Sequence, residues 1–301
     1  MSVHAIDLHL RDLPGVISSW LILDDEPALV DPGPASTLPR LREALAGFGL
    51  MPRDLRHLLL THVHMDHAGA AGELVAANPA MRVHVHRDGA PHMAEPQKLV
   101  ASTRRTFGAA HDALWGPMRP VPRDALRLWE PRRPGPIRRV RVIPTPGHIG
   151  HHLAYLHEHE GTVFTGDALG IVLTPAAPTH PPTPPPAVDL DAWRQTLVDL
   201  RGLGVERAGV AHFGLHTDVE ARTHQLAEAL DRLEARVRQA LEAGREVQDA
   251  RAFHEESLEA LADVVPKEWV ERYYEVFRAD NDWKGVQRWV ETTSSQGEGE
   301  P

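Results

Sequence analysis

Four side chains able to bind metal fall within six residues of the segment THVHMDHAGA, residues 61–70. His62 and His64 end an apolar run that predicts a strand, and side chains alternate along a strand, so both imidazoles would point to one side. Asp66 and His67 lie in the loop beyond, which can turn them toward a second centre. The pattern predicts a segment that serves two metal ions; the alternative is a local excess in a chain with 20 histidines.

Three more residues of ligand type follow other predicted strands. His148 lies in the turn of VIPTPGH, Asp167 follows VFTG, and His212 ends GVAH. Side chains delivered by separate strand ends can assemble a site at one edge of a sheet scaffold. Neutral imidazoles and carboxylates suit zinc, iron or manganese. The chain has no cysteine, so thiolate ligands and cysteine nucleophiles are excluded.

Together these motifs resemble the metallo-β-lactamase superfamily, in its glyoxalase II-like and lactonase-like metallo-hydrolase branch. The resemblance runs in order over residues 16–215. It implies an α/β fold, the four-layer αββα sandwich, here with added C-terminal helices. It also implies two divalent metal ions, zinc before iron or manganese, with these ligands: His62, His64 and His148 on one ion, Asp66, His67 and His212 on the other, and Asp167 bridging both. Asp31, in LVDPG, stands where the family often has an aspartate that orients a ligand.

The chemistry implied by the resemblance is hydrolysis by a metal-bridging hydroxide. Two bridged ions would lower the pKa of a shared water from about 15.7 to about 7, and one ion would polarise the carbonyl under attack. Asp66 is the candidate catalytic residue, since it could assist proton transfer to the leaving group. The expected substrate is a small ester, thioester or lactone.

Two functions of other classes stay open. A persulfide dioxygenase-like oxidoreductase would hold a single iron through a subset of these ligands, whereas the complete set favours two metals. A metal-binding protein without turnover would use the helices from residue 216 onward as an interaction surface. Flavodiiron oxygen reductases have glutamate at the position of His64, which argues against that branch.

Apolar periodicity and turn residues predict alternating strands and helices over the first 215 residues. Strands are expected at 16–23, 27–31, 56–62, 82–86, 138–144, 152–158, 162–167 and 207–214, and helices at 36–49, 68–79 and 189–202. A helical insertion near the site is expected at 88–130. This catalytic domain, 1–215, would be followed by a helical C-terminal extension, 216–292, and a disordered tail, 293–301.

In the extension, apolar residues alternate spacings of four and three, which predicts a helix packed lengthwise on another: Val219, Thr223, Leu226, Leu230, Leu233 and Val237. We expect this seam to pack against helices at 254–265 and 267–292, whose aromatic residues would be packing residues; a homodimer contact is the alternative. Trp115, Trp193 and Phe213 are candidate walls of the site. His84, His86, His151 and His152 are further candidates for binding substrate or orienting ligands.

The amino-acid composition limits the classes of binding partner that we expect. Lys and Arg number 32 against 42 for Asp and Glu, a formal charge of −10 that disfavours nucleic acid. The first 15 residues lack the basic and apolar segments of a secretory signal, and no apolar run reaches the ~18 residues that cross a bilayer. We therefore expect a cytoplasmic protein with a small-molecule substrate and no nucleic-acid or membrane partner.

Overall fold

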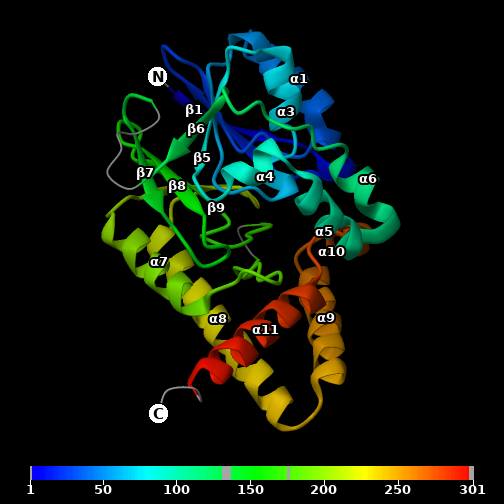
Figure 1. The fold of residues 1–301 in the computed structure, drawn as a ribbon. Coiled ribbons are helices and arrows are strands. Elements are labelled where there is room, and N and C mark those ends of the chain that lie inside the picture. The colour runs from blue at the N-terminus through cyan, green and yellow to red at the C-terminus, as the bar shows by residue number, and fades with distance from the viewer. Residues whose placement is uncertain (1, 131–136, 175–176, 298–301) are drawn as a thin grey trace. The chain divides into compact units, whose positions relative to one another are not determined.

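The computed structural model describes residues 2–130, 137–174 and 177–297 (Figure 1). The chain forms two compact units. The first comprises Met1–Pro144, His151–Gly166 and Val205–Thr217, and the second comprises Thr145–Gly150, Asp167–Gly204 and Asp218–Pro301. This division differs from the boundary expected at 215/216, because Thr145–Gly150 and Asp167–Gly204, which precede that boundary, group with the C-terminal helices.

The first unit holds two mixed β-sheets. The six-stranded sheet runs in chain order: β1 (Ser2–Asp7), β2 (Ser18–Leu23), β3 (Ala28–Val30), β4 (His57–Leu59), β5 (Arg82–His86) and β6 (Leu126–Trp129). Strands β1 to β3 pair antiparallel, and β3 to β6 pair parallel. The five-stranded sheet has the order β11 (Gly214–His216), β10 (Arg207–Val210), β9 (Thr162–Gly166), β8 (Leu153–His157) and β7 (Val140–Pro144), with only β9 and β10 parallel.

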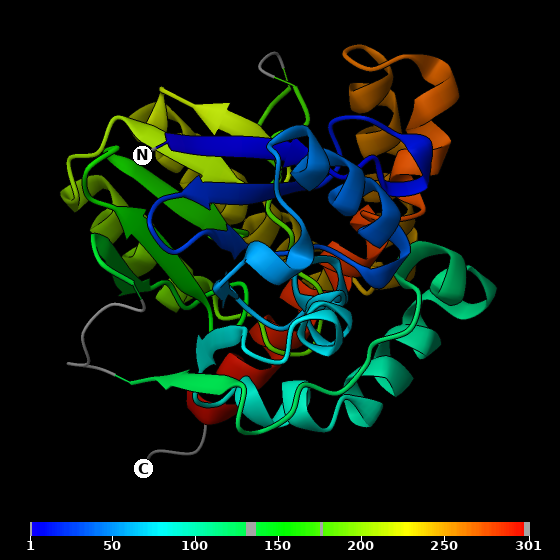
Figure 2. The same ribbon diagram turned by 90° about the horizontal axis from the view of Figure 1, so that it is seen from above.

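A shared apolar core joins the two sheets. Trp20, Val30 and Leu59 from the first sheet cluster with Tyr155 and Phe164 from the second, all at most 3% exposed. Figure 2 shows the strands of the two sheets overlaid in two layers. Burial of side chains of this size contributes on the order of 1.5–3 kcal/mol each. The α/β class, with two sheets and C-terminal helices, is confirmed.

Helices of the first unit connect the parallel strands. The helix α1 (Leu38–Gly47) links β3 to β4, while α2 (Met65–Ala68) and α3 (Ala71–Ala77) link β4 to β5. The predicted helical insertion contains α4 (Ala90–Ala94), α5 (Gln97–Phe107) and α6 (His111–Trp115), but it ends in strand β6, which the sequence did not indicate. Single 3-10 turns occur at Leu10–Asp12, Ala35–Thr37, Pro52–Asp54 and Gly108–Ala110.

The second unit is helical. It contains α7 (Leu190–Gly202), α8 (Val219–Glu242), α9 (Glu246–Ala262), α10 (Lys267–Tyr274) and α11 (Ala279–Gly297). All six residues of the predicted seam on α8 are buried, and α8 contacts α7, α9 and α11, so the seam packs within the chain as expected.

Two helix boundaries at the C-terminus differ from the prediction. The stretch 267–292 is not one helix, because the backbone turns between α10 and α11. Near the start of α11, Asp282 accepts a hydrogen bond from the Thr183 backbone at 2.7 Å, a distant contact that local periodicity does not reveal. The helix then continues through Gly297, so residues 293–297 of the expected disordered tail are helical; 298–301 lie outside the described residues.

Within the described part of the chain, none of the helices combines the length and the apolar character that crossing a bilayer requires.

Candidate metal centre

The THVHMDH segment is held in place at the end of β4. The Leu60 backbone donates to the His84 carbonyl at 2.9 Å, and the Leu60 carbonyl accepts from the Tyr155 hydroxyl at 2.8 Å. Burial, and then the nearby Asp31 charge, raise the pKa of Tyr155 well above its ordinary value, so its hydroxyl remains a donor. Gly166, at φ +50°, lies against Thr61: a Cβ there would come within 2.5 Å of the Thr61 hydroxyl. This close packing fixes the backbone from which the histidines project.

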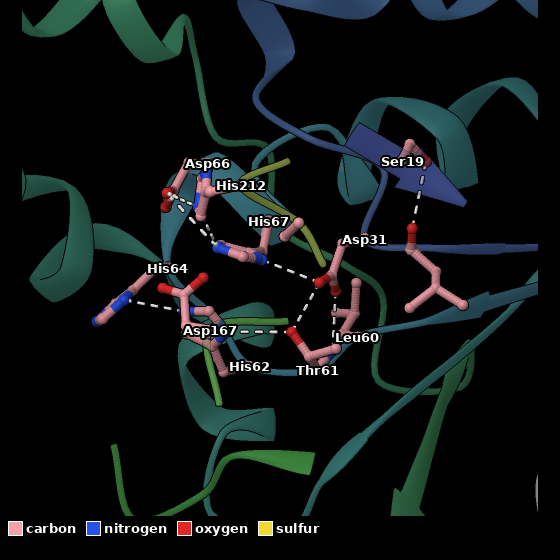
Figure 3. Close-up of polar contacts among 12 residues, drawn as sticks. Ser19, Asp31, Leu60, Thr61, His62, His64, Asp66, His67, Asp167 and His212 are labelled. Atoms are coloured by element: carbon pink, nitrogen blue, oxygen red, sulfur yellow. Dashed lines mark hydrogen bonds and ion pairs between the residues drawn. The ribbon is translucent and has the colours of Figure 1, made fainter. Parts of the chain in front are cut away.

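Asp31 links this segment to the first sheet. It follows β3 in a left-handed backbone conformation, φ +49°, which aspartate tolerates better than most residues. Its carboxylate accepts hydrogen bonds from the Thr61 backbone at 2.8 Å, the Thr61 hydroxyl at 2.7 Å and His67 Nδ1 at 2.9 Å (Figure 3). Asp31 thus orients the His67 ring, as the sequence suggested.

Asp66, His67 and His212 turn toward one another (Figure 3). Their ligand atoms all lie within 4.8 Å of one another. Asp66 Oδ2 is 3.5 Å from His67 Nε2 and 3.4 Å from His212 Nε2, while the two Nε2 atoms are 3.3 Å apart. The outer nitrogen of His212, Nδ1, donates to the Val16 carbonyl at 2.9 Å. The structure therefore brings together the three residues predicted for one ion.

His62 and His64 form a neighbouring pair. Their facing atoms, His62 Nε2 and His64 Nδ1, are 3.0 Å apart, and His62 Nδ1 lies 3.1 Å from the Thr61 hydroxyl. Because that hydroxyl donates its own proton to Asp31, it can accept from His62. The ring of His152 stacks on His62, with centroids 4.9 Å apart and an interplanar angle of 28°. His152 thus supports a predicted ligand from the side.

His148 and Asp167 belong to the second unit, where they approach each other. His148 Nε2 is 3.3 Å from Asp167 Oδ2, and His148 Nδ1 donates to the Pro182 carbonyl at 2.8 Å. The buried Trp193 packs edge-on against the His148 ring and donates its Nε1 hydrogen to the Ala168 carbonyl at 2.9 Å. Of the three candidate wall residues, Trp193 therefore positions a predicted ligand.

The donor set of the first unit fits a cation. His67 and His212 each direct Nδ1 at an oxygen acceptor, so a neutral ring carries its proton there and not on Nε2. The two facing Nε2 atoms then present lone pairs to each other at 3.3 Å, beside a carboxylate oxygen. Such a contact is repulsive by itself and becomes favourable around a divalent ion. An acceptor on the outer nitrogen is also the usual arrangement for metal-bound histidine.

The other predicted candidates make several different contacts. His84 Nε2 is hydrogen-bonded to His57 Nδ1 at 2.9 Å, and His86 Nδ1 accepts from the Asp88 backbone at 3.1 Å. Trp115 is buried against Phe107. His151 is buried, and Phe213 gives its carbonyl to His216 Nε2 at 2.8 Å. The contacts given for His84, His86 and Trp115 join them to residues other than the predicted metal ligands.

Sequence reasoning missed the partners that hold the ligands. Thr61 is a buried threonine that joins Asp31 and His62, and its place directly before the HxHxDH motif was the signal available. The Val16 and Pro182 carbonyls are backbone groups, which residue type cannot reveal.

The chain belongs to the metallo-beta-lactamase superfamily, whose family model matches residues 12–212. This confirms the family suggested by the motifs, and the matched segment contains all seven predicted ligands.

Curated relatives carry several names. The chain is 25% identical over 219 residues to the metallo-beta-lactamase fold-containing protein ST1585 of Sulfurisphaera tokodaii, covering 71% of this chain and 78% of ST1585. It is 29% identical over 113 residues to thioesterase pkgB of Emericella nidulans, covering 38% and 24%. It is 30% identical over 154 residues to a hydroxyacylglutathione hydrolase of Alkalilimnicola ehrlichii, covering 50% and 46%. The chain thus spans about a quarter of pkgB and under half of the hydrolase.

Solved structures share the fold. The metallo-beta-lactamase family protein TTHA1429 of Thermus thermophilus superposes with a TM-score of 0.64 at 23% identity, covering 98% of this chain and 94% of that chain. TTHA1623 in a di-iron-bound form superposes with a TM-score of 0.52 at 26% identity, covering 69% and 93%. The first likeness covers nearly the whole chain, C-terminal helices included.

Proposed function

We propose that this protein is a binuclear metallo-hydrolase that cleaves a small ester, thioester or lactone. The observation that carries the proposal is the geometry of His67 and His212, whose Nε2 atoms face each other at 3.3 Å while both Nδ1 atoms donate to oxygen acceptors. The names of two relatives, a thioesterase and a hydroxyacylglutathione hydrolase, support hydrolysis of an acyl bond. The di-iron form of TTHA1623 supports a two-metal centre and keeps iron beside zinc as a candidate.

In this proposal His148 and Asp167 complete the centre. His148 would join His62 and His64 on one ion, Asp66 would join His67 and His212 on the other, and Asp167 would bridge them. The pairing of His148 Nε2 with Asp167 Oδ2 at 3.3 Å, with Nδ1 on a carbonyl, gives these two residues the same ligand-like arrangement as the cluster of the first unit. When bound, the ions would supply a nucleophilic water at neutral pH and polarise the substrate carbonyl.

The chain's own residues have distinct tasks in this reaction. Asp31 and Thr61 keep the imidazoles oriented, so little reorganisation is needed as charge develops. The Asp66 side chain is 18% exposed, whereas the His67 and His212 side chains are 0% exposed. Asp66 is thus the member of its triad that solvent and substrate can reach. We assign to its carboxylate the transfer of a proton to the leaving group.

The test is to load chelator-treated protein with zinc, iron or manganese and to assay ester, thioester and lactone hydrolysis. We expect turnover of at least one bond type, dependent on metal. The variant His67→Ala should lose it, whereas His159→Ala, an exposed histidine of the same unit, should retain it. Inactivity of the fully metallated protein on all three bond types would refute the proposal. One iron per chain with oxygen consumption on a persulfide would establish the dioxygenase alternative, and tight metal binding without turnover the non-catalytic one.

A further inference from the structure

The second unit contains a cavity of about 350 Å³, walled by α8, α9, α10 and the segment 171–181. Its walls are mainly apolar, with Leu233, Leu261, Val264 and the rings of Phe253 and Phe277 among them. A volume in this range, at the lower end of the ~300–1000 Å³ of small-molecule sites, suits a compact apolar group. Tyr273 and Tyr274 of α10, which were expected mainly to pack, line this space.

One polar group in the wall has no partner. Tyr273 is 6% exposed, lines the cavity, and its hydroxyl makes no hydrogen bond in the described structure. A buried hydroxyl left without a partner is unfavourable, and it is normally satisfied by a ligand or water. Burial first, then Tyr274 and Asp167, raise the pKa of Tyr273 well above its ordinary value, so the hydroxyl stays protonated and can donate. Ile171, in the cavity wall, directly follows a turn that begins at Asp167 and is closed by a hydrogen bond from the Gly170 backbone to the Asp167 carbonyl at 2.9 Å, so the cavity lies beside a proposed metal ligand of the same unit.

The charged residues in the wall are already paired. Arg236 donates to Asp249 at 2.8 Å and to Glu256 at 2.6 Å, and Arg232 reaches Glu228 at 3.4 Å. His180 Nε2 contacts Asp282 at 2.8 Å. A charged occupant would have to compete with these partners, whereas a neutral one would not. The cavity therefore favours a neutral guest over a multiply charged one such as glutathione.

We propose that this cavity binds the apolar acyl group of the substrate, and that Tyr273 donates a hydrogen bond to an acceptor oxygen on that group. This inference rests on the proposed function. It adds which part of the substrate the protein recognises, namely the acyl group. Tyr273 is then a specificity-determining residue, because an acyl group without the acceptor leaves its hydroxyl unpaired.

The test uses propiophenone and propylbenzene, which share a carbon skeleton and differ in the ketone oxygen. Titration calorimetry with the full chain should show propiophenone bound about 3- to 10-fold more tightly, the usual effect of one neutral hydrogen bond. Tyr273→Phe should abolish this preference and leave propylbenzene binding unchanged or improved. Tyr274→Phe, an adjacent wall residue whose hydroxyl is held by Ser257, should keep the preference. A preference that survives Tyr273→Phe, or the binding of neither compound, would overturn the inference.

Filling the cavity gives an independent measurement. Ala229→Leu on α8 and Ala260→Leu on α9 add bulk at the wall, and each should weaken both ligands by at least about tenfold. Ala221→Leu, at an exposed position of α8, should change neither. The thermal midpoint of each variant shows that it is folded, and Ala260 is exposed enough to accept the change. Binding without hydrolysis would refute the proposed function alone, whereas acyl hydrolysis unaffected by either filling variant would refute the cavity inference alone.

Discussion

Two histidine pairs of the first unit differ in where their protons go. His57 Nδ1 and His84 Nε2 are 2.9 Å apart, and one ring donates to the other. His67 and His212 face each other through Nε2 at 3.3 Å, but each ring donates a hydrogen bond through its other nitrogen, Nδ1, to an oxygen acceptor. The first pair is complete as a hydrogen bond, whereas the second directs two ring nitrogens at one point, where a cation fits. The partner of the outer nitrogen, more than the closeness of the rings, is therefore the feature that marks a histidine as a candidate metal ligand.

The largest expected effect comes from removing a histidine of the second pair. His212→Ala should lower metal affinity and kcat/KM by more than about 100-fold, because loss of a ligand costs more than the ~10–100-fold loss of an outer hydrogen-bond partner. His84→Gln should leave metal content unchanged. Elemental analysis of both variants measures their metal content. Loss of metal from His84→Gln, or full metal retention in His212→Ala, would contradict the distinction between the two histidine pairs.

The next effect concerns the acceptor on the outer nitrogen. Asp31→Asn replaces one of two accepting carboxylate oxygens with an NH2 group, which cannot accept a hydrogen bond from His67 or Thr61, so metal affinity should fall by about 10- to 100-fold. Asp25→Asn, in the exposed turn between β2 and β3, is the control and should bind metal as the wild type does. Competition against a chelator of known affinity measures the change. Equal affinities for the two variants would show that Asp31 acts only in folding.

A smaller effect tests the backbone that presents His148. Gly147 has φ +144°, and a Cβ there would lie 2.3 Å from Trp193 Cβ and 2.5 Å from its Cα. Gly147→Ala should therefore lower the free energy of unfolding by about 1–3 kcal/mol and weaken metal binding. Gly150→Ala, where the added Cβ meets nothing within 4 Å, should do neither. Denaturant unfolding of both variants measures the change in the free energy of unfolding.

The effect that is smallest at neutral pH concerns pH dependence and belongs to the first pair. Burial, then His57, Arg127 and Arg82, lower the pKa of His84 from 6.5 to about 3. The folded state thus binds a proton less readily than the unfolded state, so the free energy of unfolding should fall as pH drops from 6.5 toward 3, by up to about 1.4 kcal/mol per pH unit. Above pH 6.5 this group contributes no slope. His84→Gln should flatten the acid limb of the stability curve, and an unchanged limb would contradict the assignment.

The fold could be predicted from sequence largely where strands are buried and ligands follow them. The apolar run before His62 and the β8 and β9 segments were sufficient to place those strands. Strands β1, β6 and β11 were missed, because each lies at the edge of its sheet or is short, and pairs through the backbone without a continuous apolar run. The break between α10 and α11 was missed because it accompanies distant contacts of Asp282.

The candidate site also has parts that the sequence could predict and parts that it could not. Residue type and spacing were sufficient to propose that Asp66 and His67 serve one centre, and the resemblance to the family added His212 to them, a group that the structure brings together. Nothing in the spacing showed that Thr61 bridges Asp31 and His62. The Tyr273 hydroxyl was also beyond prediction, because an aromatic residue on a helix normally packs and only the three-dimensional structure shows which hydroxyl lacks a partner.

The central claim is that the histidine and aspartate cluster holds two metal ions, and counting them tests it most directly. Protein purified without added chelator is analysed for zinc, iron and manganese by inductively coupled plasma mass spectrometry, with the protein concentration from amino-acid analysis. We predict two divalent ions per chain in total, of which a His212→Ala variant loses at least one. A wild-type protein that contains no bound transition metal, and takes up none on addition of zinc, iron or manganese, would contradict the account.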